Sequence, residues 1–219
     1  MNSTKTALFG GALLSAGIAH AQQLEFADNG FFPSSYSFAY AYVSDTNYVY
    51  TRNSSYDPSV LPADQTATAG GWSASGSVTF NTMTANADAG SETGAYVAAN
   101  GRAYAYVTQA EDTDVILSWD FTNEQPGVAP ENSFITIFDF NAGDVIFEIN
   151  TGSVATGSPS GVETVTLLAG VPYGITLSAD IFGPDGVGGT AFAELRVVPA
   201  PATALLGVAW RGLAARRRR

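Results

Sequence analysis

Residues 113–122 read TDVILSWDFT, and their apolar and polar side chains alternate with a period of two. The large apolar side chains share one face of this segment: Val115, Leu117, Trp119 and Phe121. Polar Ser118 and Asp120 occupy the opposite face. Such alternation is typical of a β-strand with one face in a core. The same period recurs from Gln22 to Val198 and no helical period lasts three turns, so we predict an all-β domain.

Alternating runs separated by clusters of Gly, Pro, Asn, Asp and Ser predict about ten strands in all. Besides 113–122, they cover residues 36–44, 47–52, 72–83, 94–109, 134–140, 144–150, 162–168, 173–182 and 190–198. The turn Asn141-Ala142-Gly143 joins two of them into a hairpin. Short strands at this spacing predict a two-sheet antiparallel β-sandwich of the jelly-roll kind, with a closed barrel as the alternative.

The N-terminus carries the features of an export signal. Lys5 precedes the apolar run 7–19, and Ala19 and Ala21 are the small residues that signal peptidase accepts before its cut. We therefore predict a helical signal peptide over residues 1–21 that is removed after Ala21.

The chain ends in VVPAPATALLGVAWRGLAARRRR, residues 197–219. Residues 202–215 would form a helix of about 21 Å, which is shorter than the ~30 Å hydrocarbon core of a bilayer. Arg211 weakens this helix further, because a cation is costly inside a membrane. We predict a short apolar helix that associates transiently with the membrane and leaves its terminal arginines on the cytoplasmic side. An ordinary anchor or an unprocessed basic end is the alternative.

A leader, a proline motif, an apolar helix and a basic tip in this order resemble the PEP-CTERM sorting architecture of Gram-negative bacteria. The motif comprises Pro199, Ala200 and Pro201, with Ala200 where the family has glutamate. The basic cluster comprises Arg216, Arg217, Arg218 and Arg219. The resemblance implies that the membrane protease exosortase cuts near the prolines after transient anchoring in the inner membrane. It also implies delivery to the outer cell surface or extracellular matrix, often in cells that make exopolysaccharide.

We thus expect a signal peptide at 1–21, a β-sandwich domain at 22–197 and a sorting tail at 198–219. The chain has a net charge of −11, but the region between its two ends keeps only Arg52, Arg102 and Arg196 against all twenty acids, or −17. Such a surface repels phosphates and excludes nucleic-acid binding. This region also lacks lysine, cysteine and histidine, which excludes Ser-His-Asp and Cys-His catalysis, Schiff-base lysines, thiolate or imidazole metal sites and disulfides.

Carboxylates remain as candidates for two kinds of site. A glycosidase needs two of them about 5 to 9 Å apart, and four lie on polar strand faces: Asp120, Glu148, Asp180 and Glu194. Calcium ligands could come from two acidic turns, one with Glu111, Asp112 and Asp114 and the other with Asp139, Asn141 and Asp144. The second turn does not match a calcium loop, because its twelfth position is Asn150 where glutamate belongs. We therefore expect solvated turn acids, no catalytic residue and no cofactor, with calcium as the open alternative.

Aromatic side chains alternate along two of the predicted strands. Tyr36, Phe38, Tyr40 and Tyr42 share one face of the first strand, and Tyr104 and Tyr106 repeat the pattern in a second. Rows of rings on an exposed sheet bind sugars in lectin-like sandwiches, which makes Tyr40, Tyr42, Tyr104 and Tyr106 candidate glycan-binding residues. In a sandwich, however, the bulky face of a strand usually forms the core, so we expect these rings inside and the alternate Ala and Ser residues outside.

Taken together, these features predict an exported, non-enzymatic protein of the cell surface or of an exopolysaccharide-containing matrix. Its expected partners are signal peptidase, exosortase and extracellular polysaccharide. A carbohydrate-binding module that uses the tyrosine rows is the alternative function.

Overall fold

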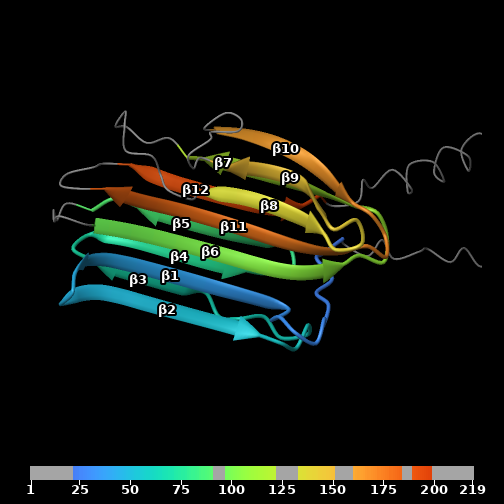
Figure 1. The fold of residues 1–219 in the computed structure, drawn as a ribbon, viewed down its shortest axis with the longest axis horizontal. Coiled ribbons are helices and arrows are strands. Elements are labelled where there is room, and N and C mark those ends of the chain that lie inside the picture. The colour runs from blue at the N-terminus through green and yellow to red at the C-terminus, as the bar shows by residue number, and fades with distance from the viewer. Residues whose placement is uncertain (1–21, 91–96, 122–132, 151–159, 184–188, 199–219) are drawn as a thin grey trace, which may run out of the picture. The chain divides into compact units, whose positions relative to one another are not determined.

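Two six-stranded antiparallel sheets make up the part of the chain that the structure describes (Figure 1). The structure is a computed structural model and describes residues 22–90, 97–121, 133–150, 160–183 and 189–198. No helix occurs among these residues, and the predicted all-β class with two antiparallel sheets is confirmed. The expected terminal helices lie outside the described residues.

Each sheet is built from strands of both halves of the chain. Sheet A contains β1 (Ser35–Ser44), β2 (Asn47–Ser55), β6 (Val97–Thr108), β8 (Phe134–Asp139), β9 (Asp144–Asn150) and β11 (Pro172–Gly183). Sheet B contains β3 (Gln65–Ala69), β4 (Trp72–Val78), β5 (Thr82–Asp88), β7 (Thr113–Asp120), β10 (Ser160–Leu167) and β12 (Thr190–Val197). The spatial orders are β2-β1-β6-β11-β8-β9 and β10-β7-β12-β5-β4-β3, so β1 to β4 extend both sheets beyond β6 and β5.

The core lies between the sheets and changes composition along them. Large side chains fill it beneath β7, β8, β11 and β12. They include Leu117, Trp119, Ile135, Ile137, Ile175, Leu177 and Leu195, each at most 6% exposed. Alanines dominate beneath β1, β5 and β6: Ala39, Ala41, Ala85, Ala87, Ala99, Ala103 and Ala105 are all fully buried. The face predicted for residues 113–122 is confirmed, because its four apolar side chains are all buried.

The two sheets touch where β4 packs on β1 and β6. A Cβ atom at Gly76 would collide with the backbone carbonyl oxygens of Arg102 and Phe38. A Cβ atom at Gly101 would collide with the carbonyl oxygen of Asn86. Backbones this close leave room for little besides glycine, alanine and serine, since sheets separated by ordinary side chains lie ~10 Å apart.

The expected placement of the tyrosine rows in the core is wrong. Small residues of β1 point inward instead: Ser35, Ser37, Ala39, Ala41 and Val43 are buried. The rings of β1 lie half-buried on the outer face, and in β6 Tyr104 and Tyr106 do the same, with Ala103 and Ala105 inside. The prediction assumed that the bulkier face of a strand forms the core. The close approach of the sheets at Gly76 and Gly101 reverses this rule here.

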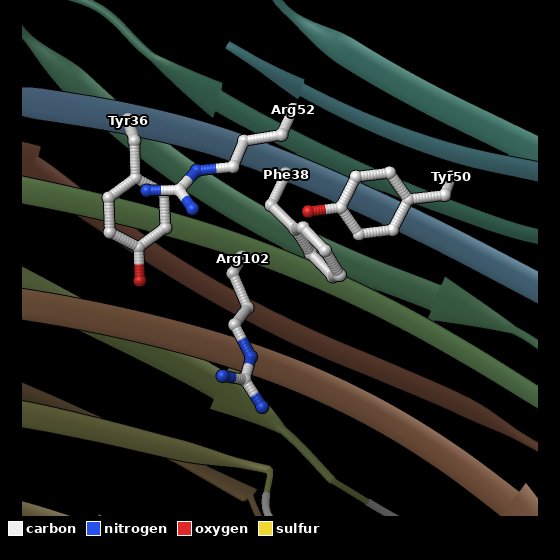
Figure 2. Close-up of a pocket in the computed structure, with 5 residues that line it drawn as sticks. All are labelled: Tyr36, Phe38, Tyr50, Arg52 and Arg102. Atoms are coloured by element: carbon white, nitrogen blue, oxygen red, sulfur yellow. The ribbon is translucent and has the colours of Figure 1, made fainter. Parts of the chain in front are cut away.

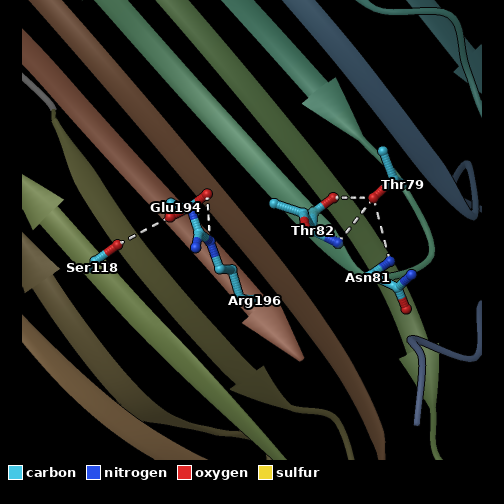
Figure 3. Close-up of polar contacts among 6 residues, drawn as sticks. All are labelled: Thr79, Asn81, Thr82, Ser118, Glu194 and Arg196. Carbon is cyan, nitrogen blue, oxygen red and sulfur yellow. Dashed lines mark hydrogen bonds and ion pairs between the residues drawn. The ribbon is translucent and has the colours of Figure 1, made fainter. Parts of the chain in front are cut away.

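Residues 72–83, predicted as a single strand, form β4 and β5 with a tight turn between them. Figure 3 shows the hydroxyl of Thr79, which accepts hydrogen bonds from the backbone N–H groups of Thr82 at 2.9 Å and Asn81 at 3.3 Å. The same hydroxyl donates to the carbonyl of Thr82 at 3.0 Å. Side-chain hydroxyls favour turns in this way. Sequence analysis also missed β3, because alanines are the only apolar residues of QTATA, although Ala67 and Ala69 are buried.

The hairpin predicted at residues 141–143 is confirmed between β8 and β9. A carboxylate oxygen of Asp139 accepts the N–H groups of Asn141 at 2.7 Å and Ala142 at 2.9 Å. Gly143 takes a φ of 70°, which favours glycine. Within β8, Ile135 and Ile137 are fully buried, so its phenylalanines belong to the outer face.

Candidate functional site

The outer face of sheet A carries a continuous set of aromatic side chains, which we call the aromatic face. Its members come from β1, β2, β6, β8 and the residue after β8: Tyr36, Phe38, Tyr40, Tyr42, Tyr48, Tyr50, Tyr104, Tyr106, Phe138 and Phe140. Tyr48 and Tyr50 on the edge strand β2 are each 57% exposed. Contiguous apolar side chains at a protein surface are often binding sites, so this face is the candidate functional site.

The strand register places these rings against one another. Tyr36 lies opposite Tyr104, and Tyr40 lies opposite Tyr50. The Tyr36 and Tyr104 rings stack with centroids 5.2 Å apart and planes inclined by 14°. Phe38 meets Tyr50 edge-on at 5.3 Å. Such contacts are favourable between cross-strand neighbours, so the rings are held in fixed orientations before any ligand binds.

All four candidate glycan-binding residues lie on this face. The rings of Tyr40 and Tyr42 stack at 6.1 Å, and the Tyr42 hydroxyl donates to Asp45 at 2.8 Å. The ring of Tyr106 contacts Phe140 at 5.3 Å. Tyr104 lies beside Tyr36, its partner on β1, and two residues before Tyr106 on β6.

Sequence analysis did not assign four rings to this surface, Tyr48, Tyr50, Phe138 and Phe140, nor the neighbouring arginines Arg52 and Arg102. The run NYVYTR at residues 47–52 alternates like the other strands and carries the signal for Tyr48, Tyr50 and Arg52. Arg102 has the same parity in β6 as Tyr104 and Tyr106. A guanidinium on the same side as the rings indicates an outward face, because arginine is rarely buried in a core.

Five residues of the aromatic face and its arginines line a hollow of about 210 Å³ (Figure 2). They are Tyr36, Phe38, Tyr50, Arg52 and Arg102. In Figure 2 the guanidinium of Arg52 lies over the ring of Tyr36, and its carbon is 5.3 Å from the ring centroid. This contact is a cation–π interaction that fixes the Arg52 side chain on the surface.

The arginines of this hollow differ from the remaining arginine of the described residues. On the outer face of sheet B, Arg196 forms an ion pair with Glu194 at 2.8 Å (Figure 3). Within the described ranges, Arg52 and Arg102 form no ion pair. The Nε atom of Arg102 is buried and has no hydrogen-bond partner among the residues that the structure describes. A buried donor without a partner is costly, so this position favours an acceptor that the described residues do not supply.

The four carboxylates considered for hydrolysis are divided between the two outer faces. Asp120 and Glu194 lie on sheet B, whereas Glu148 and Asp180 lie on sheet A.

Acids of the turn at residues 111–114, considered as an alternative calcium site, serve local structure. Asp112 accepts the N–H of Ala169 at 2.9 Å, and Asp114 accepts the hydroxyl of Thr166 at 2.6 Å. Among the residues that the structure describes, no three His, Cys, Asp or Glu side chains are grouped to hold a metal ion.

No protein-family model matches this chain, and no curated protein matches its sequence significantly. Over the described ranges, no helix has the length and apolar character needed to cross a bilayer. The predicted sorting residues Pro199, Ala200 and Pro201, the basic cluster, and the cleavage residues Ala19 and Ala21 lie outside the described residues.

Burial raises the pKa of Tyr104 to about 12, and the neighbouring phenols of Tyr36 and Tyr106 add to this rise. The folded protein therefore holds this proton more tightly than the unfolded chain, whose phenols titrate at about 10. The resulting stability is present below pH ~10 and is lost as the pH rises through ~12.

We predict that a phenol titrating at about 12 appears in the wild type and is absent from Tyr104→Phe. Ultraviolet absorbance of the phenolate against pH measures this directly. The wild type should also lose more unfolding free energy than Tyr104→Phe across the same alkaline range. Identical titration curves for the two proteins would show that the ring is not enclosed as described.

Proposed function

We propose that this chain is an exported, non-enzymatic β-sandwich of the cell surface or extracellular matrix, and that its aromatic face binds polysaccharide there. The observation that carries the proposal is the outward placement of the rings of β1 and β6, in contrast to the expected burial. A strand that exposes its bulky side and buries alanine gives up hydrophobic stabilisation. A partner that covers the rings would recover it.

The chemistry of the face favours a sugar. Seven of its ten members are tyrosines, which combine a flat apolar ring with a hydroxyl that donates and accepts hydrogen bonds. Sugar rings likewise have apolar faces and hydroxyl edges. The rings repeat at every second residue along a strand and again on neighbouring strands of the sheet. Such a broad, repeating surface suits a repeating polymer better than a compact small ligand.

Export and sorting are proposed from the two ends of the chain. The apolar run ending in Ala19 and Ala21, the Pro199-Ala200-Pro201 motif and the terminal arginines support processing by signal peptidase and exosortase after transient membrane association. The strand orders β6-β11-β8-β9 and β10-β7-β12-β5 support a jelly-roll classification of the body. The three expected regions, 1–21, 22–197 and 198–219, are part of this proposal.

We predict that Tyr40→Ala combined with Tyr50→Ala lowers the affinity of the secreted protein for its polysaccharide at least about tenfold, because two stacking surfaces are lost. Affinity electrophoresis in gels containing single polysaccharides measures the change, and we expect the polysaccharide to be recovered unhydrolysed.

A matched control removes exposed apolar side chains from sheet B. Ile116→Ala and Val162→Ala, at residues 37% and 69% exposed, should leave binding unchanged. Equal losses in both pairs of variants would contradict a role for the aromatic face. Release of reducing sugar that Glu148→Gln or Asp180→Asn abolishes would contradict a non-enzymatic function.

We predict that Pro199→Ala with Pro201→Ala, or deletion of residues 216–219, leaves the sorting tail attached to the exported protein. Mass spectrometry of the protein recovered from the cell envelope and the medium measures this. The matched control is Pro172→Ala, a proline of β11 outside the motif. Unchanged mature mass and location in the motif variants would show that the tail is not processed at this site.

A further inference from the structure

We propose that the polysaccharide bound by the aromatic face is acidic, and that a uronic-acid carboxylate binds in the hollow between Arg52 and Arg102. This inference rests on the proposed polysaccharide-binding function and names the chemical class of its ligand. It follows from the placement of cations in a chain that has very few.

The two arginines flank one ring. Phe38 of β1 lies opposite Arg52 of β2 on one side and opposite Arg102 of β6 on the other. Neighbouring strands lie about 4.8 Å apart, so the two arginine backbones are about 10 Å apart across the Phe38 position. A pyranose stacked on Phe38 would therefore have a guanidinium on either side.

The charge distribution favours an anionic ligand at this position. Two of the three arginines between the chain's predicted targeting segments line the same hollow, although this region has a net charge of −17. A protein so acidic repels a polyanion unless cations are gathered where it binds. A neutral sugar would not require two arginines at its binding site. Three carboxylates near this face do not line the hollow: Asp45, which accepts the Tyr42 hydroxyl, Glu148 of β9 and Asp180 of β11.

Both arginines retain hydrogen-bonding capacity for a ligand. Arg52 and Arg102 form no ion pair within the described residues, and Nε of Arg102 is a buried donor without a partner. Guanidinium groups present parallel N–H donors that match the two oxygens of a carboxylate. By contrast, Arg196 on sheet B already engages the carboxylate of Glu194.

The test uses the secreted protein with three polysaccharides: polygalacturonate, neutral dextran and dextran sulfate. We expect the wild type to bind polygalacturonate more tightly than dextran. Arg52→Gln with Arg102→Gln should weaken polygalacturonate binding at least about tenfold, because hydrogen bonds between charged groups are lost. Arg52→Lys with Arg102→Lys should also weaken it, because lysine keeps the charge and loses the paired donors. Arg196→Gln is the matched control and should change binding less than twofold.

Arg52 is exposed on an edge strand, so Arg52→Gln alone keeps the test valid if the double variant does not fold; it should still weaken polygalacturonate binding. Three outcomes would overturn the inference. Binding to dextran that equals binding to polygalacturonate would leave the proposed function standing and remove the acidic ligand. If the protein bound dextran sulfate more tightly than polygalacturonate, and the lysine variant bound polygalacturonate as tightly as the wild type, the hollow would attract anions in general and not carboxylates in particular. Absence of binding to all three polymers would contradict the inference and the proposed function together.

Discussion

The direct contact between the backbones of the two sheets at Gly76 and Gly101 is the constraint on which the other features of this protein depend. A single methyl group at either position would meet carbonyl oxygens of the opposite sheet. Where the sheets are this close, the inward positions of β1 and β6 hold serine, alanine and glycine, and the inward valines lie toward the strand ends. Because the side chains of a strand alternate, every small residue placed inside puts its neighbour outside. The outward positions hold the aromatic rings, so the narrow interior and the aromatic face are two consequences of one packing arrangement.

This arrangement changes how the domain is stabilised. Beneath β7, β8, β11 and β12 the sandwich has an ordinary core of large apolar side chains. Beneath β1 and β6 the interior is thin, and much of the apolar area lies on the outer surface, where rings pack against rings and Arg52 covers Tyr36. Such a surface is ordered before it meets a ligand, which lowers the entropy lost on binding. The arginines that interrupt the rings then give the surface a preference that rings alone would not have.

The fold class and most strands could be predicted from the sequence, because alternation with a period of two indicates which residues share a face of a strand. The period does not state which face is inside. For residues 113–122 the choice was clear, since Ser118 and Asp120 oppose four large apolar side chains. For β1 both faces lack charge, and the assumption that the bulky side chains belong inside was wrong.

Two signals in β6 indicated that the tyrosines face outward: Arg102 lies on the same face of the strand as Tyr104 and Tyr106, and Gly101 lies on the same face as Ala103 and Ala105. The close contact itself involves β4 and β6, which are distant in sequence, so no local pattern could reveal it. The alternation continues through Thr79, so residues 72–83 were predicted as one strand. In the structure, hydrogen bonds of the Thr79 hydroxyl form a turn that divides this segment into β4 and β5.

The outward orientation of the rings is tested most directly by cysteine labelling, because the chain contains no cysteine of its own. Tyr106→Cys and Val107→Cys place a thiol at adjacent positions of β6, the first on the aromatic face and the second fully buried. Under native conditions, Tyr106→Cys should react with a soluble thiol reagent nearly as fast as the unfolded protein does. Val107→Cys should react at least about a hundredfold more slowly, since its thiol is reached only when the sandwich opens. The reverse order of reactivity would place the tyrosines in the core and contradict the account of both the fold and the binding surface.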